Sequence, residues 1–526
     1  MTSLLARLTA TRRTRWWTTF LLTALVAGVW GATTPLFGAP DEPAHVIRAA
    51  GVVRGDLVGT TREGEPDYVR YVSVPAIFDS VTIPYVGEPH LRTVCFAFDR
   101  NVTPDCLSFS GSKDPRPVPT HVGLYPPVYY GMVGAASLGL ASVSGVLLMR
   151  AATILVCAAL VAWACWSARR APNHRAALLG VILALTPMTL FLFGSVNPSA
   201  VEIAAAIALW AAGGMLVLEA SARVDRRLVA VTGASAIVLA LSRPISPLWV
   251  ALIAITLVVF APAGGLRRLA RDQTSRIWGA VVGVATAAQL TWIVAFDPLD
   301  IVTREGVDES TSELVRSSLG KSGSTYEQMI GLFGWVDTPA PYLTVLLWTM
   351  MLGGLILLAI VAGHHRQCVA LIGLIGAVTL VPVVLESAKA GDVGLAWQGR
   401  YTMPLAVGIP VLGGLMLATD ERRHLSLDRT RLYLVATVAL FVANLFAYVQ
   451  HLRRNMVGYD GPILFWRDPD WSPLLPEWVL IPTFALALAG LLLWLLGSAS
   501  VERAASRPAS PGFGELTMAP CNLPRL

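Results

Sequence analysis

The sequence predicts an all-α protein that crosses a membrane about twelve times. Of its 526 residues, 55% are hydrophobic and only 14% are charged, which lies outside the range of soluble globular proteins. The apolar residues form blocks of about twenty, the helix length that crosses a hydrocarbon core of about 30 Å. The net charge of +6 comes from basic residues scattered between these blocks, without a basic domain. These features exclude a soluble enzyme and a nucleic-acid-binding protein.

Twelve apolar segments are candidates for membrane-spanning helices. The weakest are 227–242 and 245–262, because the first is short and Arg243-Pro244 interrupts the apolar run. If these two do not span, ten spans remain. The twelve segments lie near residues 17–37, 145–167, 175–194, 198–219, 227–242, 245–262, 277–296, 341–362, 368–386, 402–418, 431–450 and 477–497.

Basic residues predict the orientation of the chain, because lysine and arginine in short loops mark the cytoplasmic side. Residues 1–16 form a basic start. A signal peptide also starts this way, but the apolar run here is longer than a signal core and many spans follow. We therefore expect a transmembrane domain over 17–497, both termini in the cytoplasm, and a disordered tail at 498–526. The other expected cytoplasmic clusters are Arg169-Arg170-Arg175, Arg223-Arg226-Arg227, Arg267-Arg268-Arg271-Arg276 and Arg422-Arg423-Arg429-Arg431.

The apolar segment 125–140 would be a thirteenth span by hydropathy alone. Counting it would move every arginine cluster to the outer side, against the positive-inside tendency. We therefore expect an interfacial or re-entrant helix, started by Pro126-Pro127, with its tyrosines at the depth of the lipid headgroups.

With this topology, the longer outer segments are 38–144, 297–340, 387–401 and 451–476. Most residues with useful chemistry lie in them, so an enzyme of this design would act at the outer face. Cys95 and Cys106 share the first outer loop and could form a disulfide if that loop faces an oxidising compartment. Their spacing alone does not establish the pairing.

The first outer loop begins with two acids and an imidazole, Asp41, Glu42 and His45. One interpretation is structural, with Asp41 as a helix N-cap and Glu42 in the first turn, where the helix dipole favours acids. The other is catalytic. A carboxylate at the membrane boundary can act as a general base towards a hydroxyl group, provided that a donor site lies nearby.

Two arginines are candidates for that donor site. Arg400 lies between Gln398 and Tyr401 at the outer end of an apolar segment, where it could bind a lipid phosphate through two parallel hydrogen bonds. It could equally be an interfacial anchor. Arg243 is an arginine in an apolar stretch, which suggests either a function or a connector between two short helices.

Other motifs favour structure or remain open. Asn197-Pro198-Ser199, followed by Glu202, is typical of a helix cap. Trp335 could offer an aromatic face to a sugar, or it belongs to an ordinary solvated loop. No nucleotide-binding, metalloprotease or serine-hydrolase motif occurs. We therefore predict no metal site and no definite cofactor, although the acids leave a divalent metal open.

Several motifs together resemble an uncharacterised family of bacterial polytopic membrane proteins. That family is itself similar to the GT-C class of membrane glycosyltransferases, which includes protein mannosyltransferases and aminoarabinose transferases. The resemblance covers about residues 17–460. It rests on Pro40-Asp41-Glu42-Pro43-Ala44-His45, Tyr125-Pro126-Pro127-Val128-Tyr129-Tyr130, Asn197-Pro198, Leu332-Phe333-Gly334-Trp335 and Gln398-Gly399-Arg400-Tyr401.

The resemblance implies an inverting transfer of a sugar from a polyprenyl-phosphate donor in the cell membrane to a glycan, lipid or protein acceptor at the outer face. It implies that Asp41 is the base with Glu42 in support, and that Arg400, or alternatively Arg243, binds the carrier phosphate. The 125–140 segment is similar to a juxtamembrane helix of those enzymes. The implied substrate-binding residues are His45, Tyr125, Tyr129, Arg243, Trp335, Gln398, Arg400 and Tyr401.

Two other classes remain open from the sequence. A transporter or flippase of a lipid-linked sugar or small solute would use Arg243 and the broken helices near it as a gate. A membrane scaffold without catalytic activity is the third class. The sequence does not predict the oligomeric state.

Overall fold

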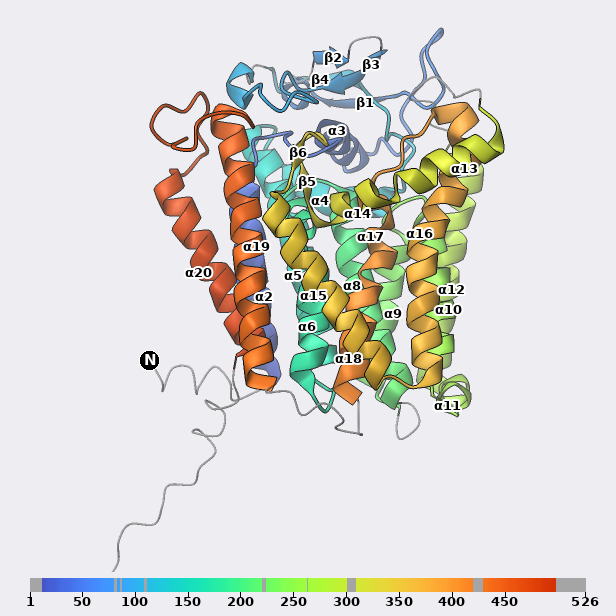
Figure 1. Ribbon diagram of the computed structural model, residues 1–526. Helices are drawn as coiled ribbons and strands as arrows, with labels where there is room; N and C mark the ends of the chain where they lie inside the picture. The colour runs from blue at the N-terminus through green and yellow to red at the C-terminus, as the bar shows by residue number, and fades with distance from the viewer. Residues whose placement is uncertain are drawn as a thin grey trace, which may run out of the picture.

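Long helices stand side by side, and short strands and helices cover one end of them, in the computed structural model (Figure 1). The structure describes residues 12–79, 83–85, 88–107, 111–219, 224–262, 264–299, 309–419 and 429–497. The expected tail at 498–526 lies outside these residues. We call the covered end the strand end. The opposite end, where α2 starts and α11 lies, is called the arginine end.

Nine helices in the described residues are long and apolar enough to cross a membrane. A tenth span results if α6 (His174–Ala184) and α7 (Pro187–Phe193), which meet at an angle of 68°, count as one broken helix. The nine are α2 (Arg12–Thr33), α5 (Val143–Ala168), α8 (Pro198–Glu219), α12 (Gln273–Phe296), α15 (Tyr342–Ala362), α16 (His365–Val393), α17 with α18 (Gly399–Ala406 and Gly408–Thr419), α19 (Arg429–Val457) and α20 (Glu477–Leu496).

The count of twelve spans is not confirmed, although every segment expected to span is helical. When α6 and α7 are counted as one span, the two missing spans correspond to α9 (Arg226–Ala240) and α10 (Ser246–Phe260), which have 15 residues each. A helix of that length is about 22 Å long, which is less than the hydrocarbon thickness. Arg243 lies in the break between them, as the sequence predicted.

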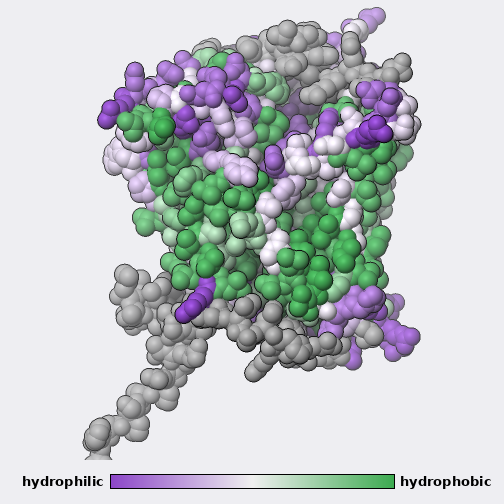
Figure 2. All heavy atoms as spheres, viewed as in Figure 1, coloured by the Kyte–Doolittle hydropathy of each residue, from purple (hydrophilic) through white to green (hydrophobic). Residues whose placement is uncertain are grey.

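Burial separates the inner helices from the outer ones. In the most apolar stretch of α8, 94% of the residues are buried, whereas in that of α12 only 6% are buried. A helix that is apolar all round fits either a core or a lipid environment. On the outside, Val294 of α12 is 86% exposed and Val361 of α15 is 72% exposed. Figure 2 shows these apolar surfaces as a green belt with polar residues towards both ends, as expected of a membrane protein.

The strand end is built mainly from the first loop. Strands β1 (Arg70–Pro75) and β4 (Pro115–Thr120) pair antiparallel, with Arg70 opposite Thr120, and β2 (Ile83–Tyr85) pairs with β3 (Glu88–Thr93). The short helices of this end are η1 (Ala76–Phe78), η2 (Pro104–Cys106), α3 (Glu42–Val52), α4 (Pro127–Gly134) and η3 (Ala135–Ser137), together with α13 (Thr311–Gly320) and α14 (Ser322–Gly331) (Figure 1). Helix α11 (Gly265–Arg271) lies at the arginine end.

Helix α4 occupies the segment that hydropathy alone would assign as a span. It has only eight residues and starts at Pro127, so it is about 12 Å long and too short to cross a bilayer. The following 3-10 turn ends at Ser137, three residues before the predicted end of the helix at 140.

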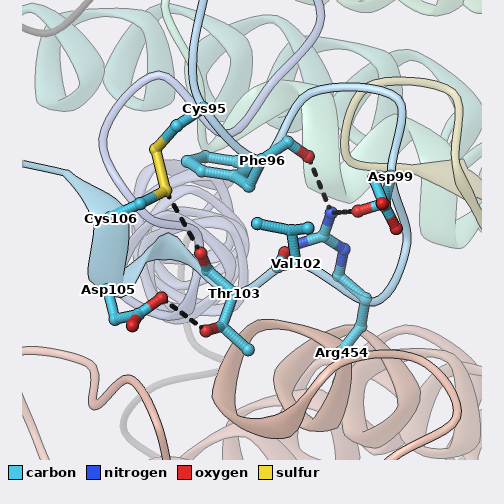
Figure 3. Close-up of a disulfide and its surroundings, with 8 residues drawn as sticks. All are labelled: Cys95, Phe96, Asp99, Val102, Thr103, Asp105, Cys106 and Arg454. Carbon is cyan, nitrogen blue, oxygen red and sulfur yellow. Dashed lines mark hydrogen bonds between the residues drawn. A yellow bond between two sulfur atoms is a disulfide. The ribbon is translucent and has the colours of Figure 1, made fainter.

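A disulfide between Cys95 and Cys106 closes part of the first loop (Figure 3). The guanidinium of Arg454 on α19 donates to the carbonyl oxygens of Phe96 at 3.1 Å and Asp99 at 2.9 Å, inside the loop that the disulfide closes. Arg454 also pairs with Asp337 at 2.9 Å, in the hairpin of β5 (Leu332–Phe333) and β6 (Thr338–Pro339). One arginine therefore joins two segments of the strand end to α19.

Candidate active site

Asp41 is the residue just before α3, and its backbone is left-handed, with φ +62°. Its carboxylate accepts a hydrogen bond from Nη2 of Arg400 at 2.6 Å, and Nε2 of His121 lies 3.8 Å from the other oxygen. The side chain is 32% exposed, whereas that of Arg400 is 3% exposed. Burial would raise the pKa of the Asp41 carboxyl, but Arg400 and His121 outweigh this effect and lower the pKa to about 2.

Arg400 lies at the start of α17, and its hydrogen-bonding capacity is only partly used. Nη2 also donates to the Tyr401 hydroxyl at 3.1 Å. Its Nε and Nη1 are buried and have no hydrogen-bond partner among the described residues. Because unpaired buried donors are costly, this guanidinium is suited to bind a further anion.

A second arginine lies on the Tyr401 ring. The guanidinium carbon of Arg243 is 4.7 Å from the ring centroid and that of Arg400 is 5.1 Å from it. Arg243 also pairs with buried Glu202 at 3.6 Å, donates to the Ser199 hydroxyl at 3.1 Å and interacts electrostatically with Tyr125. We call Asp41, Tyr125, Arg243, Arg400 and Tyr401 the cationic site. Its elements come from four distant parts of the chain.

Glu42, next to Asp41, pairs with a different arginine. Its carboxylate is fully buried and accepts two hydrogen bonds from Arg150 of α5, from Nε at 2.8 Å and from Nη2 at 2.6 Å. The backbone N–H of Val196 donates a third bond, of 2.9 Å. The remaining N–H groups of Arg150 donate to the carbonyl oxygens of Gly31, Thr34 and Pro35.

The turn that presents Asp41 is held by side chains from three other segments. We call residues 34–41 the Asp41 turn. Besides the bonds from Arg150, Trp335 donates from Nε1 to the Phe37 carbonyl at 3.0 Å, and Asn197 donates from Nδ2 to the Pro40 carbonyl at 3.0 Å. Phe37, like Asp41, has a φ of +62°. Such backbone strain persists only where the surroundings enforce it, and these bonds supply that enforcement.

Comparison with known proteins identifies the family. A family model described as "Predicted membrane protein (DUF2142)" matches residues 22–409. The chain belongs to this family. A search of curated proteins found no match for this DUF2142 member.

Two solved structures are similar to this DUF2142 chain in overall arrangement. They are ArnT from Cupriavidus metallidurans in the apo state and ArnT from the same organism bound to undecaprenyl phosphate. Each is 16% identical, with a TM-score of 0.43; they cover 94% and 93% of this chain and, in both cases, 78% of ArnT. A likeness at this level carries no residue role from ArnT to this chain.

The structure gathers part of the residue set predicted from the sequence. Asp41, Tyr125, Arg243, Arg400 and Tyr401 meet in the cationic site. His45 is buried beside it, and its Nδ1 hydrogen-bonds the Tyr130 hydroxyl at 2.9 Å. Burial lowers the pKa of His45 well below its ordinary value, so the ring is neutral and joins α3 to α4.

Three predicted substrate-binding residues have other contacts. Trp335 is 4% exposed and its ring N–H donates to the Asp41 turn, which gives it a structural contact, and its role in stacking on a sugar stays a prediction. Tyr129 is 2% exposed and hydrogen-bonds Thr153 of α5 at 3.2 Å, which indicates a packing role. Gln398 precedes α17, and its carbonyl accepts from Tyr401 N–H at 3.0 Å.

Sequence reasoning missed Arg150 and His121. Arg150 carried a usable signal, because it is an arginine inside an apolar helix, the same feature that drew attention to Arg243. His121 carried none, since its proximity to Asp41 depends on the folding of the first loop. Among the described residues, no group of three or more His, Cys, Asp or Glu side chains is arranged to hold a metal ion.

Proposed function

We propose that the protein is a membrane glycosyltransferase that moves a sugar from a polyprenyl-phosphate donor to a cell-envelope acceptor at the outer face. Asp41 is the general base and Arg400 binds the carrier phosphate. The observation that carries the proposal is the Asp41–Arg400 pair, in which a partly open carboxylate meets a buried guanidinium with unused donors.

The phosphate would bind where Arg400 has hydrogen bonds left to make. Nε and Nη1 of Arg400 are unpartnered among the described residues, so each has a charge-assisted hydrogen bond left to donate to a phosphate oxygen. Arg243, 4.7 Å from the centroid of the Tyr401 ring, adds positive potential but is already balanced by Glu202. We therefore assign the phosphate to Arg400 and the orientation of Tyr401 to Arg243.

Phosphate binding would also activate the base. With its pKa lowered to about 2 by the arginine, Asp41 is a weak proton acceptor. A phosphate that competes for Arg400 weakens that pairing, so the pKa of Asp41 rises only when the donor is present. The empty protein then holds its base in an inactive ion pair.

The transfer is a single displacement. The acceptor oxygen attacks the anomeric carbon while its proton passes to the Asp41 carboxylate. The bond between the anomeric carbon and the phosphate oxygen breaks, and the polyprenyl phosphate leaves with that electron pair, stabilised by Arg400. Attack opposite the leaving group inverts the anomeric centre. Glu42 takes no proton in this scheme, because its oxygens are occupied by Arg150 and Val196.

Two features support an outward-facing strand end. The Cys95–Cys106 disulfide lies there, and disulfides persist mainly in oxidising compartments. Arginine-rich segments such as α11 lie at the other end (Figure 1), as expected for the cytoplasmic side. Labelling of single cysteines placed at 169–173 tests this orientation, because outside labelling of that turn would reverse it.

The deciding experiment compares Asp41→Asn with wild type in carrier release. Purified protein in lipid nanodiscs is incubated with a panel of polyprenyl-phosphate sugars and membrane acceptors, and free polyprenyl phosphate is measured. We expect Asp41→Asn to lower release by about 10² to 10⁴, the usual value of a general base. Asp67→Asn, an exposed acid of the same loop, is the control. Release that is unchanged in Asp41→Asn would remove Asp41 from the mechanism.

A second candidate function, transport of a lipid-linked sugar, draws on the broken helices. Helices α6 and α7 bend by 68°, and α9 and α10 break at Arg243 beside the buried Glu202. Interrupted helices at an ion pair are typical of transporter substrate sites. Movement of a labelled polyprenyl-phosphate sugar across sealed vesicles, without a covalent product, would favour transport over transfer.

A further inference from the structure

The loop between α19 and α20, residues 458–476, exposes large apolar side chains. Ile463 is 81% exposed and Leu474 is 75% exposed. Leu464, Trp466 and Leu475 of the same loop are exposed as well. We call these five residues the apolar loop surface. Exposed apolar side chains gathered in one segment mark a contact with a protein or with a membrane.

Contacts with α19 hold the loop in this form. Phe465, which lies between two exposed residues, is 2% exposed and packs in a small cluster with Met456 of α19. The Met456 carbonyl also accepts a hydrogen bond from the N–H of Asp470 at 2.9 Å. Nε of Arg453 donates to the Pro462 carbonyl at 3.3 Å. The loop is therefore folded on α19, and the apolar loop surface is the side that this folding leaves outside.

The same loop is joined to the first loop of the strand end. The Asp460 carboxylate accepts hydrogen bonds from Nη2 of Arg100 at 3.1 Å and from Nδ2 of Asn101 at 3.0 Å. The N–H of Asp460 donates to the side-chain oxygen of Asn101 at 3.0 Å. A contact that holds loop 458–476 therefore also holds this part of the strand end.

The apolar surface of α20 leads directly to this loop. Trp478, Leu486 and Leu493 of α20 are 72%, 75% and 60% exposed. They recur at intervals of seven or eight residues, so they lie on one face of the helix, and α20 is apolar enough to cross a membrane. Trp478 lies in the first turn of α20, directly after Leu474 and Leu475 of the loop. The loop lies beside the start of α20, at the outside of the bundle (Figure 1).

This continuity indicates that a lipid surface covers the loop. Membrane proteins concentrate tryptophan at the boundary between headgroups and hydrocarbon, and Trp466 and Trp478 are both exposed here. Tryptophan with leucine is also the apolar mixture of segments that lie in that boundary. The charged residues of the loop, Arg467, Asp468 and Asp470, are exposed as well, which suits a segment at the boundary rather than in the hydrocarbon.

We propose that loop 458–476 inserts the apolar loop surface into the leaflet at the strand end. Ile463, Trp466 and Leu474 then lie at the boundary between headgroups and acyl chains. Through the bonds of Asp460, the insertion sets the depth of the first loop relative to the membrane. This surface shares no residue with the cationic site, and the proposal does not depend on the proposed sugar transfer.

The test measures the depth of single spin labels on the purified full chain in phosphatidylcholine nanodiscs. The background is Cys368→Ser with Cys521→Ser, because the free cysteines Cys157 and Cys165 are buried. Labels are placed by Ile463→Cys, Leu474→Cys and Asp468→Cys, and Leu486→Cys is the hydrocarbon reference.

Accessibility to oxygen, which concentrates in hydrocarbon, is compared with accessibility to a nickel chelate, which stays in water. We expect the ratio of oxygen to nickel accessibility at positions 463 and 474 to approach that at 486 and to exceed that at 468. Nickel accessibility at 463 and 474 equal to that at 468 would overturn the proposal and leave the surface for a soluble partner.

Variants test whether the apolar side chains cause the insertion. Ile463→Asp with Leu474→Asp should move a label at Trp466→Cys from oxygen to nickel accessibility, whereas Ile463→Leu with Leu474→Ile should leave it unchanged. Both positions lie outside the buried cluster of Phe465, so the unfolding temperature should stay the same. A label at 466 that kept its oxygen accessibility in the aspartate pair would reject insertion by these side chains.

Discussion

Two adjacent acids, Asp41 and Glu42, are each bound by an arginine from a distant helix, yet the two ion pairs are built differently. Glu42 and Arg150 are both nearly inaccessible, and every N–H group of Arg150 has an acceptor. Asp41 is one-third exposed, and Arg400 retains unpartnered donors on Nε and Nη1. The first pair uses all its hydrogen-bond donors within the fold, and the second leaves donors unused.

The difference shows how one turn can serve two purposes. Arg150 binds Glu42 and also the carbonyls of Thr34 and Pro35, so it fixes the chain on both sides of the strained residues Phe37 and Asp41. Because the turn is fixed, Asp41 can keep its left-handed backbone conformation and its pairing with Arg400. The Glu42–Arg150 pair, with all its donors used, therefore fixes the turn. The Asp41–Arg400 pair, with donors left over, is the one available for a reaction.

The largest loss of stability should come from breaking the Glu42–Arg150 pair. Arg150→Leu leaves the Glu42 carboxylate buried without its partner, so we expect a loss of about 3–5 kcal/mol in the free energy of unfolding. Thermal and denaturant unfolding in detergent measures it. Arg150→Leu combined with Glu42→Leu should recover much of this loss, because no isolated buried charge then remains.

The comparison predicts a smaller loss for the other pair. In Arg400→Leu the Asp41 side chain can still be solvated through its exposed third, so the destabilisation should be well below that of Arg150→Leu. Equal destabilisation by the two substitutions would contradict the division between a structural pair and a functional pair.

An intermediate effect is expected from the other side chains that hold the Asp41 turn. Asn197→Ala leaves the Pro40 carbonyl without its donor, and Trp335→Phe does the same for Phe37 while keeping an aromatic ring. Each should cost about 1–3 kcal/mol and lower carrier release, because the position of Asp41 changes. Release rates are measured in the same nanodisc assay.

Asp67→Asn, the exposed acid of the first loop, is the control for these variants as well. If Trp335→Phe lowered sugar binding without changing stability, the sequence-based role of Trp335 as a sugar platform would be supported in place of the structural one.

The sequence predicted the fold class well because length and hydropathy are local properties. Every segment expected to span is helical, although 175–194 is divided between α6 and α7, and α4 has only eight residues. The number of spans was harder to predict, because α9 ends at Ala240 and α10 starts at Ser246, on either side of Arg243-Pro244, and each has only 15 residues. The connector between them contacts buried Glu202 through Arg243 and Ser246, which hydropathy does not register.

The candidate site was only partly predictable for a similar reason. Arg400 and Asp41 are separated by 359 positions, and only the resemblance to known transferases placed them together. The sequence did not show that Asp41 and Glu42 would pair with different arginines. Successive residues at a helix start point in different directions, and their partners depend on the fold. The contact of Trp335 with the Asp41 turn was not predictable, because a sequence shows an indole but not which carbonyl its N–H reaches.

The smallest predicted effect concerns pH and separates the two acids most directly. The pKa of Asp41 is lowered from 3.8 to about 2 in the folded protein, so its ion pair contributes stability that is fully present above pH 3.8 and is lost as the pH falls through about 2. Unfolding is measured from pH 6 to pH 2. Asp41→Asn should lose less stability than wild type across the lower part of this range. Arg400→Gln removes the main lowering influence, so the pKa of Asp41 in the folded protein rises towards its ordinary value and the loss of stability on acidification becomes smaller. If Asp41→Asn and wild type lost stability in parallel, the pairing of Asp41 with Arg400 in the empty protein would be rejected, and with it the proposal that donor phosphate activates the base by competing for that arginine.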